Sequence, residues 1–176
     1  MPYIPAEDRA LPYQEFISEL CEETGANFKS GAAQFFYAVL TAVYGDAERT
    51  RYFRQNELHG VLACMRMEWE QRWCPKLDTR DWHFPLFELA QGAQSLCALA
   101  ARVVECIPRE DETRRAGHLN YFITLLMVEA VSRRLLTKEE VPPYIDAIAS
   151  QIYAVVTRPY EVQAIGKNGD VFPENF

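Results

Sequence analysis

The run Gly117-His118-Leu119-Asn120-Tyr121-Phe122-Ile123-Thr124 opens an apolar segment with helical periodicity, and the expected fold is built outward from it. A fainter copy of this run, Gly31-Ala32-Ala33-Gln34-Phe35-Phe36-Tyr37, lies 86 residues earlier. Each copy leads, after a polar interval, to a second helical segment that ends at a proline, at Pro75 and at Pro159 respectively. The sequence therefore predicts one helical unit that is written twice.

Apolar residues at helical spacing predict about six helices in the chain. They fall at about 13–23, 32–44, 56–74, 86–106, 117–136 and 144–157. The second of these segments is apolar nearly all round, which is typical of a helix at the centre of a core. Strand signals are scarce, so we expect an all-α fold that forms a single compact domain over residues 1–176.

The two repeat halves are expected at about 13–78 and 86–162, followed by a C-terminal tail at 163–176. Two three-helix units of this kind would pack about a pseudo-two-fold axis, with the third helix of each half near the interface. We expect short extended termini, in which Val171-Phe172-Pro173 pairs as a short strand with Tyr3-Ile4.

Prolines, glycines and charged runs mark the boundaries that we expect between helices. Asp8 is a candidate N-cap for the first helix. The charged residues 109–115 predict a solvated loop that ends where a helix starts at Gly117. Val141-Pro142-Pro143 predicts a break before the last helix, and residues 75–85 are the expected connector between the halves.

The composition limits the classes of function. Hydrophobic residues make up 49% of the chain and aromatic residues 12%, which is enough for a packed core. The net charge of −7 argues against nucleic acids and anionic membranes as partners. No apolar run reaches the roughly 18–20 residues that a membrane span needs, and the start of the chain lacks the pattern of a secretory signal. We therefore expect a cytoplasmic protein without a membrane partner.

The cysteines and histidines predict no metal site. The five cysteines are scattered and odd in number, so reduced thiols in the core are expected. The histidines, His59, His83 and His118, are far apart and match no ligand spacing.

Several motifs resemble those of an uncharacterised family of small proteins from phages and bacteria. They are the start Met-Pro-Tyr-Ile-Pro-Ala-Glu-Asp-Arg, the Gly117–Thr124 run, the helix from Asn56 to Cys64 that continues into Glu68–Arg72, and an ending with Pro159-Tyr160-Glu161 and Asn168-Gly169-Asp170-Val171. The resemblance implies a phage or prophage setting and no particular chemistry.

Two groups of polar residues are candidates for a ligand site. Asn120, Tyr121 and Thr124 fall on about one turn of helix and could contact a polar ligand. In the first half, the candidates are Asn56, Glu57, Glu68 and Arg72. The second half carries only the first group, and the first half carries only the second group. We therefore expect the two groups to form one composite site. The alternatives are that Asn120 caps or bridges helices while Tyr121 packs with its hydroxyl satisfied, and that the two glutamates lie on a solvated helix face.

The sequence by itself does not establish a function, and three hypotheses stay open. The first is a non-catalytic phage or prophage accessory protein that sequesters a small polar ligand, with a nucleotide as one candidate, or engages a host protein. The second is a metal-dependent all-α nucleotide hydrolase, suggested by the glutamates of the third helix. The third is a structural or protein-interaction subunit that uses the aromatic residues around Trp82–Phe87. No catalytic residue, metal ligand or cofactor is predicted, and the chain is expected to be a monomer or a homodimer.

Overall fold

The computed structural model describes the backbone of residues 4–10, 12–44, 51–78, 82–89, 94–108 and 111–158, and the side chains of these residues except 10, 51–55 and 156. The described residues form helices and no strand, so the all-α prediction is confirmed. The α-helices are α1 (Tyr13–Thr24), α2 (Phe28–Tyr44), α3 (Arg51–Trp73), α4 (Gln94–Cys106), α5 (Glu112–Ser132) and α6 (Val141–Ile152). Two 3-10 turns, η1 (Glu7–Ala10) and η2 (Gly25–Asn27), and a π-helix, η3 (Tyr153–Thr157), complete the described elements.

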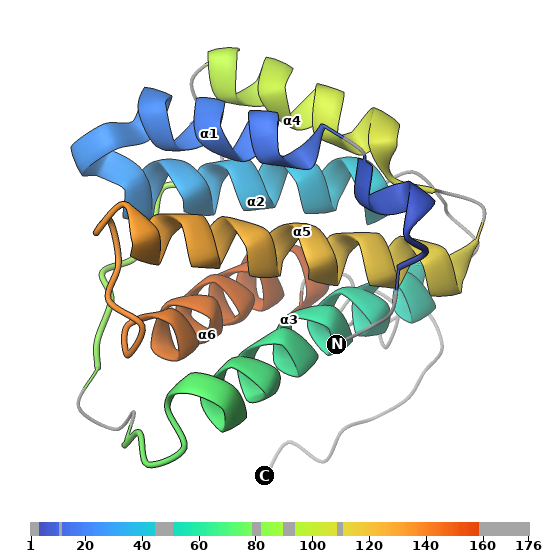
Figure 1. The fold of residues 1–176 in the computed structure, drawn as a ribbon. Helices are drawn as coiled ribbons and strands as arrows, with labels where there is room; N and C mark the ends of the chain where they lie inside the picture. The colour runs from blue at the N-terminus through green and yellow to red at the C-terminus, as the bar shows by residue number, and fades with distance from the viewer. Residues whose placement is uncertain are drawn as a thin grey trace, which may run out of the picture.

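The helices form three layers (Figure 1). α2 and α5 lie in the middle, with α1 and α4 on one side and α3 and α6 on the other. The prediction that residues 32–44 belong to a central helix is confirmed, since α2 packs against α1, α3 and α4 and buries Phe35, Phe36 and Leu40. These side chains belong to one continuous hydrophobic core that all six helices share.

The helix at Gly117 starts earlier than predicted. α5 begins at Glu112, because the Asp111 side chain caps it by accepting a hydrogen bond from the Arg114 N–H at 3.0 Å. The prediction of a solvated loop is therefore wrong for residues 112–115. Arg115 is buried, at 2% exposure, inside the first turns of the helix.

Three other expected boundaries differ from the structure. α2 begins at Phe28, so Gly31 lies inside the helix, where a Cβ atom would collide with the Thr24 side chain of α1. Pro142 and Pro143 lie in the first turn of α6, where a missing N–H costs nothing. The segment after Pro85 stays non-helical through Leu89, and the next helix begins at Gln94. The expected strand at 171–173 and the tail at 163–176 lie outside the described residues.

The predicted duplication would relate α1 to α4, α2 to α5 and α3 to α6, and the members of each pair lie in contact. α1 contacts α4, α3 contacts α6, and a ring contact of 5.9 Å between Phe35 and Phe122 joins α2 to α5. The third helices of the two halves are thus neighbours, as the duplicated arrangement requires. The halves also differ, since α3 packs on α5 as well as on α6, whereas α6 packs chiefly on α3. The duplication itself stays a prediction.

Candidate functional site

The predicted group on α5 faces the interior of the protein. Asn120 and Thr124 are buried, and the Thr124 hydroxyl donates to the Asn120 carbonyl oxygen at 2.8 Å. Tyr121 is half-buried, with its ring 6.4 Å from the ring of Tyr13. These contacts match the packing alternative for Asn120 and Tyr121 more closely than a surface open to ligands.

Glu57 is the centre of a buried charge cluster. Its carboxylate accepts two hydrogen bonds from Arg115, from Nε at 3.0 Å and from Nη2 at 2.6 Å, and a third from the Tyr44 hydroxyl at 3.0 Å. The Glu57 carboxylate raises the pKa of Arg115, while burial raises the pKa of the Tyr44 hydroxyl. The raised pKa values keep Arg115 charged and the Tyr44 hydroxyl protonated, so both remain donors. The cluster joins α5 to α3 and α2.

The other predicted residues of α3 lie on its surface. Glu68 and Arg72 form an ion pair with each other one turn apart, and Asn56 is exposed. Exposed pairs of this kind contribute little to stability. The seven predicted residues therefore occupy three different environments: the interior of α5, the buried cluster and the surface of α3. A composite ligand site made from them stays a prediction.

A second polar network joins residues that the sequence did not predict to lie together. The His118 side chain, 1% exposed, lies between the Tyr13 hydroxyl, 2.8 Å from its Nδ1, and the Asp8 carboxylate, 3.0 Å from its Nε2. Arg114 donates to the same Asp8 oxygen at 2.8 Å. These two donors lower the pKa of Asp8, and burial raises the pKa of Tyr13.

This network ties the N-terminal segment to the helices. Asp8 does not cap α1, whose N-cap is Pro12, and the prediction of that cap is wrong. No local pattern links a residue at position 8 to residues at positions 114 and 118, so the sequence carried no signal for the contact. The Tyr13 and His118 side chains are both buried, which favours a structural role over one in contact with substrate.

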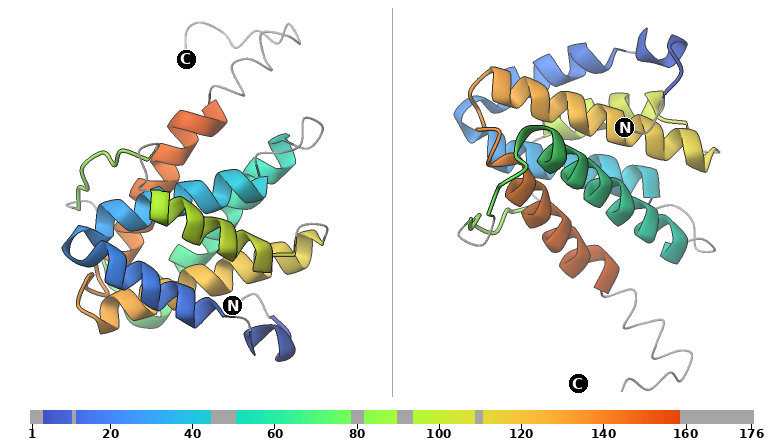
Figure 2. Two further views of the ribbon diagram at one scale, coloured as in Figure 1. Left: turned by 90° about the horizontal axis from the view of Figure 1, so that it is seen from above. Right: turned by 60° about the horizontal axis from the view of Figure 1, so that its bottom comes forward.

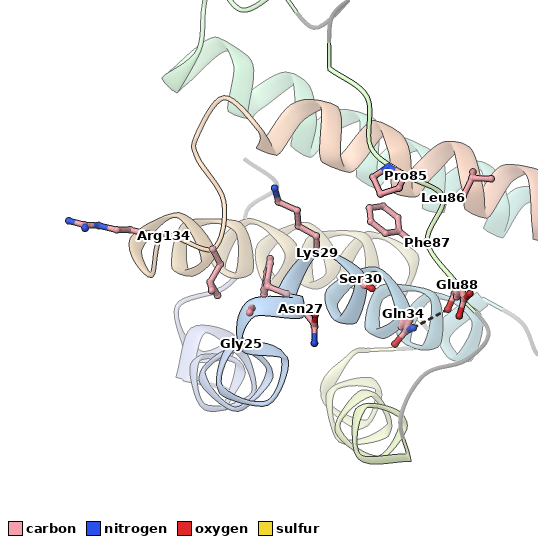
Figure 3. Close-up of a pocket in the computed structure, with 13 residues that line it drawn as sticks. Gly25, Asn27, Lys29, Ser30, Gln34, Pro85, Leu86, Phe87, Glu88 and Arg134 are labelled. Carbon is pink, nitrogen blue, oxygen red and sulfur yellow. Dashed lines mark hydrogen bonds between the residues drawn. The ribbon is translucent and has the colours of Figure 1, made fainter.

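A cleft lies elsewhere, at the start of α2 (Figure 3). It has a volume of about 610 Å³, and we call it the α2 cleft. Its lining comes from residues 25–30 and Gln34 on one side, residues 85–88 on another, and Arg134 and Leu135 at the end of α5. None of the seven residues predicted from the sequence lines it.

One wall of the α2 cleft is the extended segment 82–89. The Phe87 N–H donates to the Gln151 side chain at 3.1 Å, and the Gln34 side chain donates to the Glu88 carbonyl oxygen at 3.1 Å. The second bond is drawn in Figure 3. Phe84 and Phe87 pack edge-on against the buried Tyr144 ring, at 5.5 and 5.7 Å. The segment is thus fixed by contacts to α2 and α6, although Leu86 remains 87% exposed.

The end of α5 places a strained residue beside this cleft. The Leu135 N–H donates to the Ala130 carbonyl at 2.9 Å, and the Arg134 N–H donates to the Val131 carbonyl at 3.0 Å. This is a Schellman motif, in which Arg134 takes the left-handed position with φ of 60° that normally favours glycine. Figure 3 shows its side chain extending away from the other lining residues.

The chemistry of the α2 cleft is mixed. Asn27, Ser30 and Gln34 supply amide and hydroxyl groups, while Pro85, Leu86 and Phe87 form an apolar wall. Lys29 adds a positive charge, which Glu140 partly balances at 2.7 Å. The described part of the chain contains no group of three or more His, Cys, Asp or Glu residues placed to hold a metal ion.

The cysteines are free in the structure, and their positions are mixed. Cys21 and Cys74 are buried as expected, but Cys64 and Cys97 are exposed, so the prediction of core thiols is wrong for those two.

The fold and the cleft define a helical protein of three layers with a cleft of small-molecule size. Comparison with family models, with curated proteins and with solved structures finds no match for this chain. Among the described residues, none of the helices combines the length and the apolar character that a membrane crossing demands.

Proposed function

We propose that this protein is a non-catalytic helical binding protein that holds a small polar ligand in the α2 cleft. The observation that carries this proposal is the cleft itself, whose volume of about 610 Å³ lies within the range of roughly 300–1,000 Å³ typical of small-molecule sites. Polar side chains on one wall and an apolar segment on the other suit a ligand that has both a flat ring and a polar edge.

A nucleoside or nucleotide is the ligand class that this lining favours. Amide side chains such as Asn27 and Gln34 offer both donors and acceptors to the edge of a base. The wall formed by Pro85, Leu86 and Phe87 offers an apolar surface to the face of a ring, and Lys29 lies where it could approach a phosphate. The resemblance to a phage and bacterial family supports an accessory protein that sequesters such a ligand in a host cell. The free cysteines support a reducing compartment, the cytoplasm.

The metal-dependent hydrolase has less support. Glu57 is fully engaged by Arg115 and Tyr44, and Glu68 pairs with Arg72, so the glutamates that suggested a metal site are held by other partners. The hypothesis of a protein-interaction subunit relied on the aromatic residues around Trp82–Phe87. Trp82 and Leu86 are exposed, but Phe84 and Phe87 pack on Tyr144, so less aromatic surface is available to a partner protein.

A thermal-shift screen of nucleosides and nucleotides, with and without Mg²⁺, tests the proposal. A ligand at about 100 times its Kd adds about 2.7 kcal/mol of stability, which raises the Tm of a chain of this size by about 5–10 °C. Ser30→Trp places a large ring in the cleft from an exposed helical position and should abolish the shift. Ala98→Trp, at an exposed position of α4 outside the cleft, should keep it.

The possible results separate the hypotheses. A shift that Ser30→Trp abolishes and that occurs without turnover supports ligand binding in the α2 cleft. Turnover that needs Mg²⁺ would support the hydrolase instead. The absence of any shift across the panel, or an equal shift in the Ser30→Trp variant, would contradict the proposal.

A further inference from the structure

The α2 cleft is formed by three segments that meet at one end of the molecule. Both views of Figure 2 show the turn η2, the extended segment 82–89 and the end of α5 gathered there. Asn27, Ser30 and Gln34 line the cleft at spacings of three and four residues, so they share one face of the helical run from η2 into α2. That face extends for about 10 Å at 1.5 Å per residue, which suits the length of a single nucleotide.

The charged side chains that line the α2 cleft are separated by sign. Figure 3 shows Arg134 at one end of the labelled residues and Glu88 at the other end, with Lys29 between them. The Lys29 ammonium is held by Glu140 at 2.7 Å and lies over the Phe84 ring, 5.5 Å from its centre. The cleft therefore has a positive end and a negative end.

Arg134, at the positive end, has a guanidinium group that is available to a ligand. Its neighbour Arg133 pairs with Glu129 at 2.6 Å, whereas the Arg134 guanidinium forms no hydrogen bond or ion pair with the described residues. The Arg134 side chain is exposed and extends away from the other lining residues. Because no partner holds it, rotation about its side-chain bonds can bring the guanidinium to the mouth of the cleft. An arginine at a φ of 60° is less stable than a glycine would be, so this cation is present at the expense of stability.

The opposite end of the α2 cleft presents hydrogen-bond acceptors. The Gln34 side-chain nitrogen donates to the Glu88 main-chain carbonyl at 3.1 Å, which leaves the Gln34 side-chain oxygen and the Glu88 carboxylate to accept from a ligand. The pairing edge of guanine carries a ring N–H beside an amino group, so two adjacent groups donate. Adenine has a ring acceptor beside its amino group, and a carboxylate repels the lone pair of that acceptor. This end of the cleft therefore favours guanine over adenine.

We propose that the α2 cleft binds a guanosine monophosphate in one fixed orientation, an inference that rests on the proposed function. The base lies at the Glu88 end with the wall of Pro85 and Phe87 against its face, and the phosphate lies at the other end, where Lys29 and Arg134 approach it. Hydrogen bonds from charged donors to a phosphate are stronger than those between neutral groups. In a chain with a net charge of −7, these two cations supply the local positive charge that an anionic ligand needs.

Calorimetric titration of the full chain with guanosine monophosphate, guanosine and adenosine monophosphate tests this proposal. We expect guanosine monophosphate to bind at least about tenfold more tightly than either of the other two compounds, because each comparison removes a hydrogen bond to a charged group. Added salt should weaken the binding of guanosine monophosphate and leave that of guanosine unchanged, because only the phosphate is charged.

Arg134→Gly separates the ligand contact from the fold. Glycine is favoured at a φ of 60°, so the Tm of the free protein should rise, while the affinity for guanosine monophosphate should fall at least about tenfold and that for guanosine should stay the same. Arg102→Gln is the matched control, since it removes the same charge from an exposed position of α4 outside the cleft and should leave binding unchanged. Glu88→Gln should reduce the preference for guanosine monophosphate over adenosine monophosphate at least about fivefold, because an amide both donates and accepts.

The results that would overturn this inference differ from those that would overturn the proposed function. Equal affinities for guanosine and its monophosphate, or equal affinities for the two monophosphates, would refute the orientation but leave a cleft that binds nucleosides or nucleotides. The orientation would also be refuted if Arg102→Gln weakened binding as much as Arg134→Gly does, because the effect would then come from overall charge. No binding of any of the three compounds would refute both the orientation and the proposed function.

Discussion

Replacing Arg115 by methionine tests the most buried arginine or lysine among the described residues. The substitution keeps most of the side-chain volume but leaves the Glu57 carboxylate, 17% exposed, without its two strongest donors. Removing one partner of a buried ion pair costs about 3–5 kcal/mol. Because Glu57 retains some contact with water and the Tyr44 hydroxyl, we expect a loss near the lower end, about 3 kcal/mol. For a chain of this size, that corresponds to a fall in Tm of about 6–12 °C.

The second substitution, Glu57→Gln, shows whether the loss comes from the unpaired charge. Glutamine keeps an oxygen that accepts from the Tyr44 hydroxyl and removes the carboxylate charge. The double variant Arg115→Met/Glu57→Gln should therefore recover most of the stability, giving a coupling energy of about 2 kcal/mol in a double-mutant cycle. Arg102→Met is the control, since the exposed Arg102–Glu19 pair should contribute about 0–1 kcal/mol.

Urea unfolding followed by circular dichroism at neutral pH measures each of these free energies. The reasoning would be refuted if Arg115→Met unfolded within about 1 kcal/mol of the parent. It would also be refuted if the double variant lost as much stability as the two single variants together, because the two residues would then not act as a pair.

Two further predictions concern the backbone and the N-terminal segment. Arg134→Gly should stabilise the protein by about 1 kcal/mol, because glycine adopts a φ of 60° without steric cost; Arg133→Gly, whose φ is −82°, should destabilise it, and urea unfolding distinguishes the two. Asp8→Asn should lower stability at neutral pH, because the hydrogen bonds from Arg114 and His118 depress the pKa of Asp8 below its ordinary value of 3.8. The contribution of Asp8 is fully present above that value and is lost as the pH falls below it, so the difference between parent and variant should disappear in acid. A difference that persisted in strong acid would contradict the proposed pairing.

The sequence was sufficient to predict the helices themselves. Periodic apolar residues such as Phe16, Ile17 and Leu20 place one face of α1 in the core, and the nearly uniform apolar character of α2 places it in the middle layer. These predictions succeed because each depends on residues within one or two turns of each other. The start of α5 was predicted too late because the Asp111 cap extends that helix beyond its apolar pattern.

The contacts that define the candidate sites required the tertiary structure. Arg115 lies within a run of charges that predicts solvent exposure, and its burial depends on Glu57, which is 58 positions away in the chain. The α2 cleft combines residues from three separate segments, none of which carries a recognisable motif. Local periodicity determines which residues become helical and which faces are apolar. Only the packing of the layers decides which polar side chains meet, because partners distant in sequence leave no pattern that a single segment can reveal.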